Sequence, residues 1–209
     1  MVFIYLNTGS DDKPTFSGPT KLEVDGKEFK AERAKPEIVD WNNDGKKDLL
    51  VGTENGTVLL LLNAGTNAKP EFKTQITLKD GEKKLQPGWR VDPAVVDWNG
   101  DGKKDLICAE ENGSVFYYEN KGTDAEPEFS GGEKISAGSK PIKVDMRARV
   151  EVVDWNNDGK LDLLVGGPER KNYKAELYLF LAKPKEEKEK PADKESSSVA
   201  VPGKARSTD

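Results

Sequence analysis

The chain has no histidine and only one cysteine among its 209 residues, and both shortages limit its chemistry. Without histidine, zinc, copper and haem sites lack their usual nitrogen ligand, and serine or cysteine nucleophiles lack their usual base. A single thiol can form no internal disulfide. We expect this residue, Cys108, to be buried in the core, because it lies in the apolar run DLICAE.

Long hydrophobic runs and a positive charge excess are also missing. No run approaches the roughly 20 apolar residues of a membrane span, and the N-terminal MVFIYLNTG lacks the features of a signal peptide. The net charge of -5 argues against nucleic acid as a partner. Residues 183–209 are rich in Lys, Glu, Pro and Ser without apolar periodicity, which predicts a disordered tail.

What the sequence does contain is an internal repeat. The segments VDWNNDGKKDLLVG, VDWNGDGKKDLICA and VDWNNDGKLDLLVG begin at Val39, Val96 and Val153, a constant spacing of 57 residues. Each is followed by an apolar run, and the first two then by a proline turn with an aromatic, KPEF or EPEF. The start of the chain, VFIYLNTGSDDKPTF, matches the second half of this unit, so the chain opens in the middle of a repeat.

The repeat predicts an all-β fold. Short β-type runs such as TKLEV, QITLK and EKISA lie between these landmarks, and the pairs Asp25-Gly26 and Asp80-Gly81 favour tight hairpins. Each unit therefore supplies about four short strands, the pattern of a four-stranded antiparallel β-propeller blade. We place the repeats at 1–182, with a partial unit at 1–38 and units from about 39, 96 and 153.

The strand count predicts about three to four blades in this chain: two strands from the incomplete first unit, two full sets of four and about three in the last. Closed single-chain propellers typically have about 4–8 blades. Two explanations of the shortfall stay open. The chain is either part of a longer propeller, or separate chains complete one ring, as a homo-oligomer or with a further chain.

Each unit carries the loop pattern D-x-N-x-D-G-x-x-D, whose side chains are hard oxygen ligands. Positions 1, 3 and 5 of a tight loop aim at one point, and the glycine at position 6 brings the backbone carbonyl of position 7 round. Calcium suits such sites because it accepts about 6–8 oxygens in irregular geometry. The predicted ligands of about three Ca²⁺ ions per chain are Asp40, Asn42, Asp44, Lys46 and Asp48; Asp97, Asn99, Asp101, Lys103 and Asp105; and Asp154, Asn156, Asp158, Lys160 and Asp162.

An EF-hand and a metal-free turn are two other interpretations of this loop. An EF-hand needs a glutamate at position 12, where this chain has Val51, Cys108 and Val165. A metal-free turn is the second, because Asp and Asn are common in β turns. Three copies at constant spacing favour the metal site.

The loop between two strands, followed by LLVG and a strand ending in NxGT, resembles the FG-GAP/VCBS repeats, whose best-known members are the integrin α-subunit propellers. The resemblance covers roughly residues 1–182. It implies calcium in the hairpin between the first two strands of a blade, usually for stability, in extracellular, periplasmic or cell-surface proteins. The FG and GAP signatures themselves are absent, so the likeness is to the bacterial-type VCBS branch, whose functions are diverse.

Two further sets of residues recur with the same spacing. Trp41, Trp98 and Trp155 occupy position 2 of each loop, either as packing between neighbouring blades or as a sugar-stacking platform. The arginines seven residues before each loop either face an anionic ligand or pair with acidic side chains of their own or the next blade; they are Arg33, Arg90 and Arg147. Trp89 lies outside this register.

These observations predict a Ca²⁺-stabilised β-propeller that binds or scaffolds a protein or polysaccharide partner and is not an enzyme. The alternative is a lectin or a carbohydrate-active, polysaccharide lyase-like propeller domain, because propellers of similar construction hold a sugar in the channel or between blades.

Overall fold

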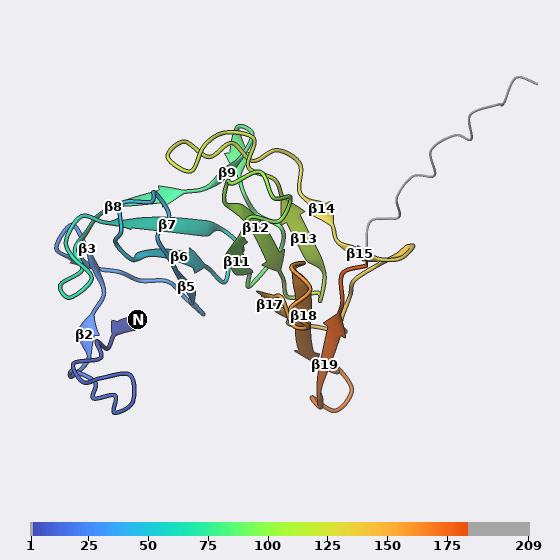
Figure 1. Cartoon of the computed structure of the whole chain (residues 1–209), viewed down its shortest axis with the longest axis horizontal. Coiled ribbons are helices and arrows are strands. Elements are labelled where there is room, and N and C mark those ends of the chain that lie inside the picture. Colours follow the sequence, from blue (N-terminus) through green and yellow to red (C-terminus); the bar gives the residue numbers. More distant parts are fainter. Residues whose placement is uncertain (1, 184–209) are drawn as a thin grey trace, which may run out of the picture.

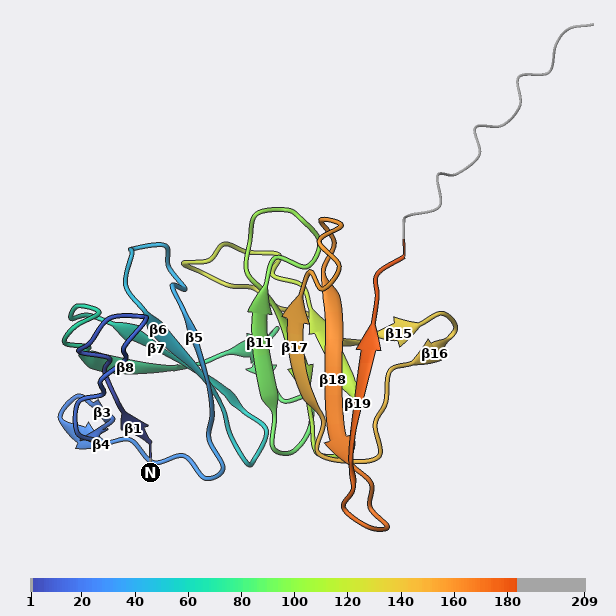
Figure 2. The same cartoon turned by 60° about the horizontal axis from the view of Figure 1, so that its bottom comes forward.

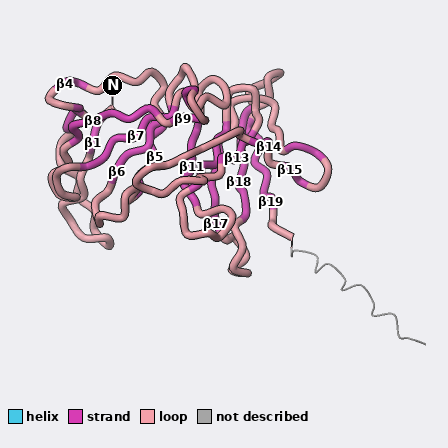
Figure 3. The backbone as a smooth tube through the Cα atoms, turned by 90° about the horizontal axis from the view of Figure 1, so that it is seen from above, coloured by secondary structure: helices cyan, strands magenta, loops and turns pink. Residues whose placement is uncertain are grey.

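A computed structural model describes residues 2–183 of the chain (Figure 1). These residues form strands, turns and loops without a helix (Figure 3), so the all-β fold class predicted from the sequence is confirmed. None of these residues lies in a helix that is long and apolar enough to cross a membrane. The predicted disordered tail lies outside the described residues except for Lys183.

The chain begins with an N-terminal half-unit of two paired strands and a hairpin. Its strands are β1 (Phe3–Ile4), β2 (Thr20–Lys21), β3 (Glu23–Val24) and β4 (Lys27–Glu28). β1 pairs with β2, and β3 with β4, both antiparallel. Asp25 and Gly26 form the two-residue turn of the hairpin with φ of 51° and 68°. Positive φ at both positions defines the type I′ turn that Asp-Gly favours.

The four antiparallel strands of the first unit pair in order along the chain. The hairpin of the half-unit extends their sheet to six strands, because β3 pairs in parallel with the fourth strand of the unit. The strands of the unit are β5 (Lys35–Val39), β6 (Asp48–Gly52), β7 (Val58–Asn63) and β8 (Phe72–Thr77), and the hairpin β9 (Lys79–Asp80) and β10 (Lys83–Lys84) follows. Asp80 pairs with Lys83, so the turn of this hairpin is Gly81-Glu82. The predicted Asp80-Gly81 turn is therefore one residue too early, because Asp80 belongs to the ladder.

The second unit repeats this arrangement, and the third ends after three strands within the described residues. The second unit consists of β11 (Asp92–Val96), β12 (Asp105–Ala109), β13 (Val115–Tyr118) and β14 (Glu133–Lys134), with the hairpin β15 (Ser136–Ala137) and β16 (Lys140–Pro141). The third unit consists of β17 (Arg149–Val153), β18 (Asp162–Pro168) and β19 (Ala175–Phe180). The first strands β5, β11 and β17 lie side by side (Figure 2). The sheets of residues 2–183 do not close into a ring.

The core is divided into three apolar clusters, each between two successive units. Leu50 and Leu60 of the first unit meet Leu106 and Cys108 of the second in one cluster. A second cluster joins the second and third units, and a third joins the half-unit to the first unit. Cys108 is fully buried, as predicted. Because both faces of an inner sheet are covered, its second and third strands are continuous apolar runs.

Candidate functional site

The three acidic loops occupy equivalent places in the three units. Each joins the first strand to the second, and the antiparallel register closes it with the pairs Val39↔Asp48, Val96↔Asp105 and Val153↔Asp162. All three loops lie at the same end of their sheets (Figure 2). The predicted metal ligands of each unit therefore belong to one loop.

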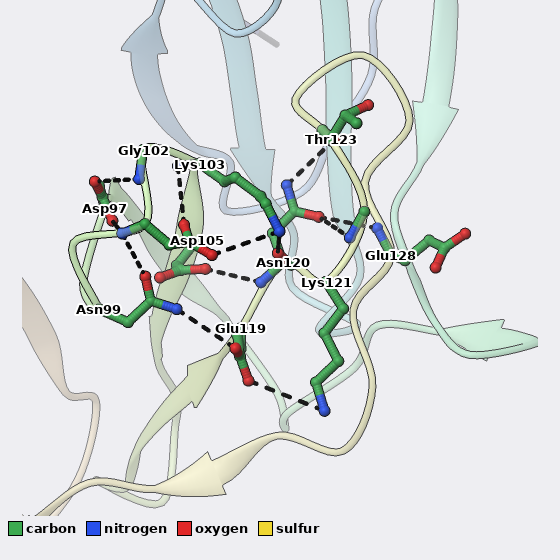
Figure 4. Close-up of polar contacts among 12 residues, drawn as sticks. Asp97, Asn99, Gly102, Lys103, Asp105, Glu119, Asn120, Lys121, Thr123 and Glu128 are labelled. Atoms are coloured by element: carbon green, nitrogen blue, oxygen red, sulfur yellow. Dashed lines mark hydrogen bonds and ion pairs between the residues drawn. The ribbon is translucent and has the colours of Figure 1, made fainter.

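Backbone N–H groups fold the loop around its first carboxylate. Asp40 Oδ1 accepts from Asp44 N at 3.0 Å, and Asp40 Oδ2 accepts from Gly45 N at 2.9 Å. Asn42 Oδ1 also accepts from Asp44 N, and Asp44 Oδ1 accepts from Lys46 N at 2.9 Å. The same bonds recur in the loops that begin at Asp97 and Asp154 (Figure 4 shows the second loop). Gly45 has a φ of 81°, which favours glycine at position 6.

The aspartate at position 9 is a buried anchor of the sheet. Asp48 Oδ2 accepts from Trp41 N, and its Oδ1 accepts from Asn63 N, both at 2.8 Å. Asp105 and Asp162 accept hydrogen bonds from the backbone N–H groups at the same two places in their units. Two N–H bonds satisfy a carboxylate that is taken out of water. Burial raises the pKa of Asp105, and the N–H groups of Asn120 and Trp98 and the Tyr117 hydroxyl act in the opposite direction.

The lysine at position 7 faces the aspartate at position 5. The Nζ to Oδ2 distances are 3.3 Å for Lys46 and Asp44, 3.5 Å in the second loop and 3.3 Å in the third. The backbone N–H of Lys46 holds the pKa of Asp44 below its usual value, and the ammonium group acts in the same direction. The lysine charge therefore offsets part of the negative charge of each loop. Sequence reasoning considered only its backbone carbonyl.

The donor types of each loop suit calcium. Within residues 2–183, no three acidic, histidine or cysteine side chains are grouped so that they could hold a metal ion. The aspartates at loop positions 1 and 5 accept backbone N–H bonds, but their carboxylate oxygens keep further lone pairs. Coordination would require the ammonium group of Lys46, or of its equivalents, to move away from the carboxylate. Three carboxylates, an amide oxygen and a carbonyl would then be available, which are ligands that calcium prefers.

The structure also identifies an asparagine that holds the loop after the third strand. Asn63 Oδ1 accepts from Gly65 N at 2.9 Å and from Glu71 N at 3.0 Å. Asn7 and Asn120 make equivalent bonds. The recurring NxGT motif was the sequence signal for this role.

The loop tryptophans pack between units, and their exposure rises along the chain. Trp41 is 1% exposed in the cluster between the first and second units. Trp98 is half-buried, with its ring centroid 6.4 Å from that of Tyr117. Trp155 is 56% exposed, because no further unit covers it within the described residues. The contacts of Trp41 and Trp98 agree with the packing interpretation.

The three predicted arginines form a row with two glutamates. Arg90 Nη2 lies 3.4 Å from Glu54 Oε1, and Arg90 Nη1 lies 3.0 Å from Glu111 Oε2. Arg33 Nε is 2.8 Å from Glu54 Oε1, and Arg147 Nε is 3.4 Å from Glu111 Oε1. Each glutamate thus bridges successive units, which corresponds to the ion-pair interpretation. Sequence reasoning missed both glutamates, although the tripeptide ENG recurs with the 57-residue spacing.

A family model described as FG-GAP-like repeat matches residues 40–108 and 97–165. The chain belongs to the FG-GAP-like repeat family. Each match runs from the first aspartate of one loop into the second strand of the next unit, so it includes the sheet and the cluster between two units. The resemblance drawn from the loop motif is confirmed. No curated protein matches the chain.

Proposed function

We propose that the FG-GAP-like units are blades of a β-propeller that binds a protein or polysaccharide partner outside the cytoplasm, and that calcium in the acidic loops stabilises the blades. The observation that carries the proposal is the threefold recurrence of one loop framework at the same end of three sheets. FG-GAP repeats usually form propellers and are typical of extracellular or surface proteins. Side-by-side first strands are the arrangement around a propeller axis.

Binding without catalysis is the role that the acidic groups support. The position-9 aspartates accept backbone N–H bonds, and Glu54 and Glu111 form ion pairs with arginines. These carboxylates stabilise turns and unit junctions. In the proposed function, calcium makes the loops rigid, and the partner binds surfaces that the rigid loops present.

A carbohydrate ligand is the second candidate, and exposed indole rings support it. Trp89 is 63% exposed and lies next to Arg90 in the row of ion pairs. Aromatic faces suit the apolar faces of sugars. Binding on a glycan array that is lost in Trp89→Ala would favour this candidate, whereas binding only to proteins would exclude it.

Thermal and urea unfolding in calcium, in magnesium and in chelator tests the metal proposal. Extracellular calcium modules bind with Kd of about 10⁻⁴–10⁻³ M. At about 10 mM calcium, each site then adds about 1.4–2.7 kcal/mol to the free energy of unfolding. Magnesium should add much less, because it retains its water ligands.

Single-site variants separate calcium binding from general damage to the loops. Asp44→Ala, Asp101→Ala and Asp158→Ala should each remove about one third of the calcium-dependent stabilisation, measured as the difference between calcium and chelator. Lys46→Met should increase that difference, because it removes the ammonium group that lies 3.3 Å from Asp44. Equal stability in calcium and chelator would show that the loops are metal-free turns.

A further inference from the structure

In the first and second units, one face of the sheet is covered by the next unit. Within residues 2–183, nothing covers the corresponding face of the third unit. In the first unit this face consists of buried side chains, among them Trp41, Val58 and Leu60. The strand registers make Leu177 and Leu179 equivalent to Val58 and Leu60. Val58 is fully buried, whereas Leu177 is 69% exposed. Trp155 in the loop and Leu164 on the second strand belong to the same face, and we call these two residues the open face.

At the opposite end of the molecule, a cavity of about 400 Å³ lies between the half-unit and the first unit. Figure 1 shows the half-unit and β19 at opposite ends. Leu49 and Phe72 line this cavity, and they are the equivalents of Leu106 and Phe129. Those two residues share a cluster with Trp41 at the junction of the first and second units. The cavity therefore occupies the place where a loop tryptophan of a preceding unit would pack.

Beside Trp41, Asn43 of the first unit bonds to Lys104 and Asp124 of the second unit, and we call this contact the polar clasp. The equivalents of its two sides lie at opposite ends of the molecule. Asn43 Nδ2 donates to Asp124 Oδ2 at 2.8 Å, and Lys104 Nζ donates to Asn43 Oδ1 at 2.7 Å. The asparagine half is repeated as Asn157, whose φ of 57° matches the 60° of Asn43. The other half is repeated as Lys47 and Asn67 in the cavity wall. Lys47 N donates to Asn67 Oδ1 as Lys104 N donates to Asp124 Oδ1.

We propose that a second copy of this chain binds here, with Trp155 and Asn157 of one copy inserted into the Leu49–Phe72 cavity of the other. The contact continues the junction that already joins the first unit to the second. The inference rests on the proposed propeller, because it treats the units as blades that pack in series. Trp155 fills the apolar part of the cavity, and Asn157 bonds to Lys47 and Asn67.

The outer strands decide how the two copies fit. By their sequences β1 and β19 are both third strands of a unit, and only one third strand can lie beside β18. β1 and β2 of one copy complete the sheet begun by β17 and β18 of the other, and β19 gives way. β19 is the strand that moves, because most of its side chains are exposed and no fourth strand covers it within the described residues. Its six residue pairs with β18 must be exchanged for pairs between β18 and β1.

The count of sheets favours two copies in a closed ring. Each copy has two complete sets of four antiparallel strands, β5–β8 and β11–β14, and half of two composite ones. The hairpin β3–β4 extends the first set to six strands. Two copies therefore give six sets of four strands, within the range of about 4–8 found in closed propellers. A head-to-tail contact closes into a ring when its rotation permits.

Sedimentation equilibrium of the full chain over a concentration series tests the proposal. We expect a monomer–dimer equilibrium that Trp155→Ala weakens at least about tenfold. Trp89→Ala is the matched control, because Trp89 is similarly exposed but lies outside the open face. Asn67→Asp should tighten the dimer, since it reproduces the carboxylate of Asp124 in the clasp.

Crosslinking then locates the contact. The chain with Asn157→Cys and Asn67→Cys should give a covalent dimer with a short bis-maleimide, and the parent chain should not, because Cys108 is buried. A full chain that stays monomeric at about 100 µM, or a dimer unchanged by Trp155→Ala, overturns the proposal. So do crosslinks within a monomer from lysines of residues 184–209 to the third unit, which would make the chain's own C-terminal segment the occupant. Calcium-dependent unfolding of Trp155→Ala is measured in parallel, so that failure of the metal proposal is seen separately.

Discussion

At the scale of single residues, the aspartates of one loop differ in what they do. Asp48 is buried and holds two backbone N–H groups of its own unit, whereas Asp44 faces solvent and the ammonium group of Lys46. The position-9 aspartate is thus a structural acceptor of backbone N–H bonds. The position-5 aspartate already faces a cation, the lysine ammonium group at position 7.

The tryptophan series predicts a graded loss of stability. Trp41→Ala should cost about 3–5 kcal/mol, because it leaves a large cavity in a closed cluster. Trp98→Ala should cost less, and Trp155→Ala less than about 1 kcal/mol in dilute monomer, because Trp155 is mostly exposed. Urea unfolding followed by circular dichroism measures all three. Equal losses would contradict packing between units as their role.

Lys35 predicts a dependence of stability on pH. Burial lowers its pKa to about 8, and the neighbouring charge of Asp92 opposes that shift. Its Nζ donates to Arg90 O at 2.7 Å. Between pH 8 and about 10 the unfolded chain holds this proton more tightly than the folded chain, so stability rises as the pH rises through that window.

The increase should be about 1–2 kcal/mol after allowance for partial solvent screening. It is measured by urea unfolding at pH 7.5 and pH 9.5. The matched control is Lys35→Met, in which this part of the pH dependence should disappear. Identical pH profiles for the two proteins would show that Lys35 titrates in the same way folded and unfolded.

At the scale of elements, the turn between the second and third strands limits how closely two units approach. Gly56 has a φ of 87°, and a Cβ on it would overlap the carbonyl oxygen of Gly88. Gly113 is placed in the same way against Val144. Glycine at these turns is needed both for the backbone conformation and for the contact with the next unit.

Gly56→Ala and Gly138→Ala separate these two requirements. Gly138 also has a positive φ, of 63°, but nothing lies within 4 Å of the position of its Cβ. Gly138→Ala should cost about 1–2 kcal/mol from backbone strain alone. Gly56→Ala should cost at least about 2 kcal/mol more, because the neighbouring backbone must move. Similar losses of unfolding free energy for both variants would mean that the two units can separate at little cost.

At the scale of the whole molecule, stability depends on contacts between successive units. Every apolar cluster joins two units, and the row of arginines and glutamates crosses the same junctions. An inner sheet is therefore stabilised from both sides and an end sheet from one. This is the nearest-neighbour behaviour of repeat proteins.

Hydrogen exchange should follow that order. Amides of β6, β7 and β12, whose side chains are mostly buried, should exchange most slowly. Amides of β1 and β19 should exchange fastest, because each belongs to an end sheet with exposed side chains. Exchange followed by mass spectrometry tests this, and a β19 as protected as β7 would contradict it.

Much of the fold was predictable because its signals are local. The 57-residue period, the Asp-Gly turn of the first hairpin and the apolar second and third strands all depend on residues close in sequence. The prediction placed the second hairpin turn one residue early, because Asp80 pairs with Lys83 and so belongs to the strand. The ion pairs of Glu54 and Glu111 could not be derived, since they join residues 21 or 36 positions apart across unit junctions.

The sequence by itself determined the all-β units, their order and the acidic loop between the first two strands, because glycine, aspartate and apolar periodicity act over a few residues. Only the tertiary structure decided what those residues contact. It placed Asp48 under the loop as a buried anchor, paired Arg90 with two glutamates, and left Trp155 exposed where Trp41 is buried. Identical local motifs have different environments because packing against a neighbouring unit is a property of position in the assembly of sheets.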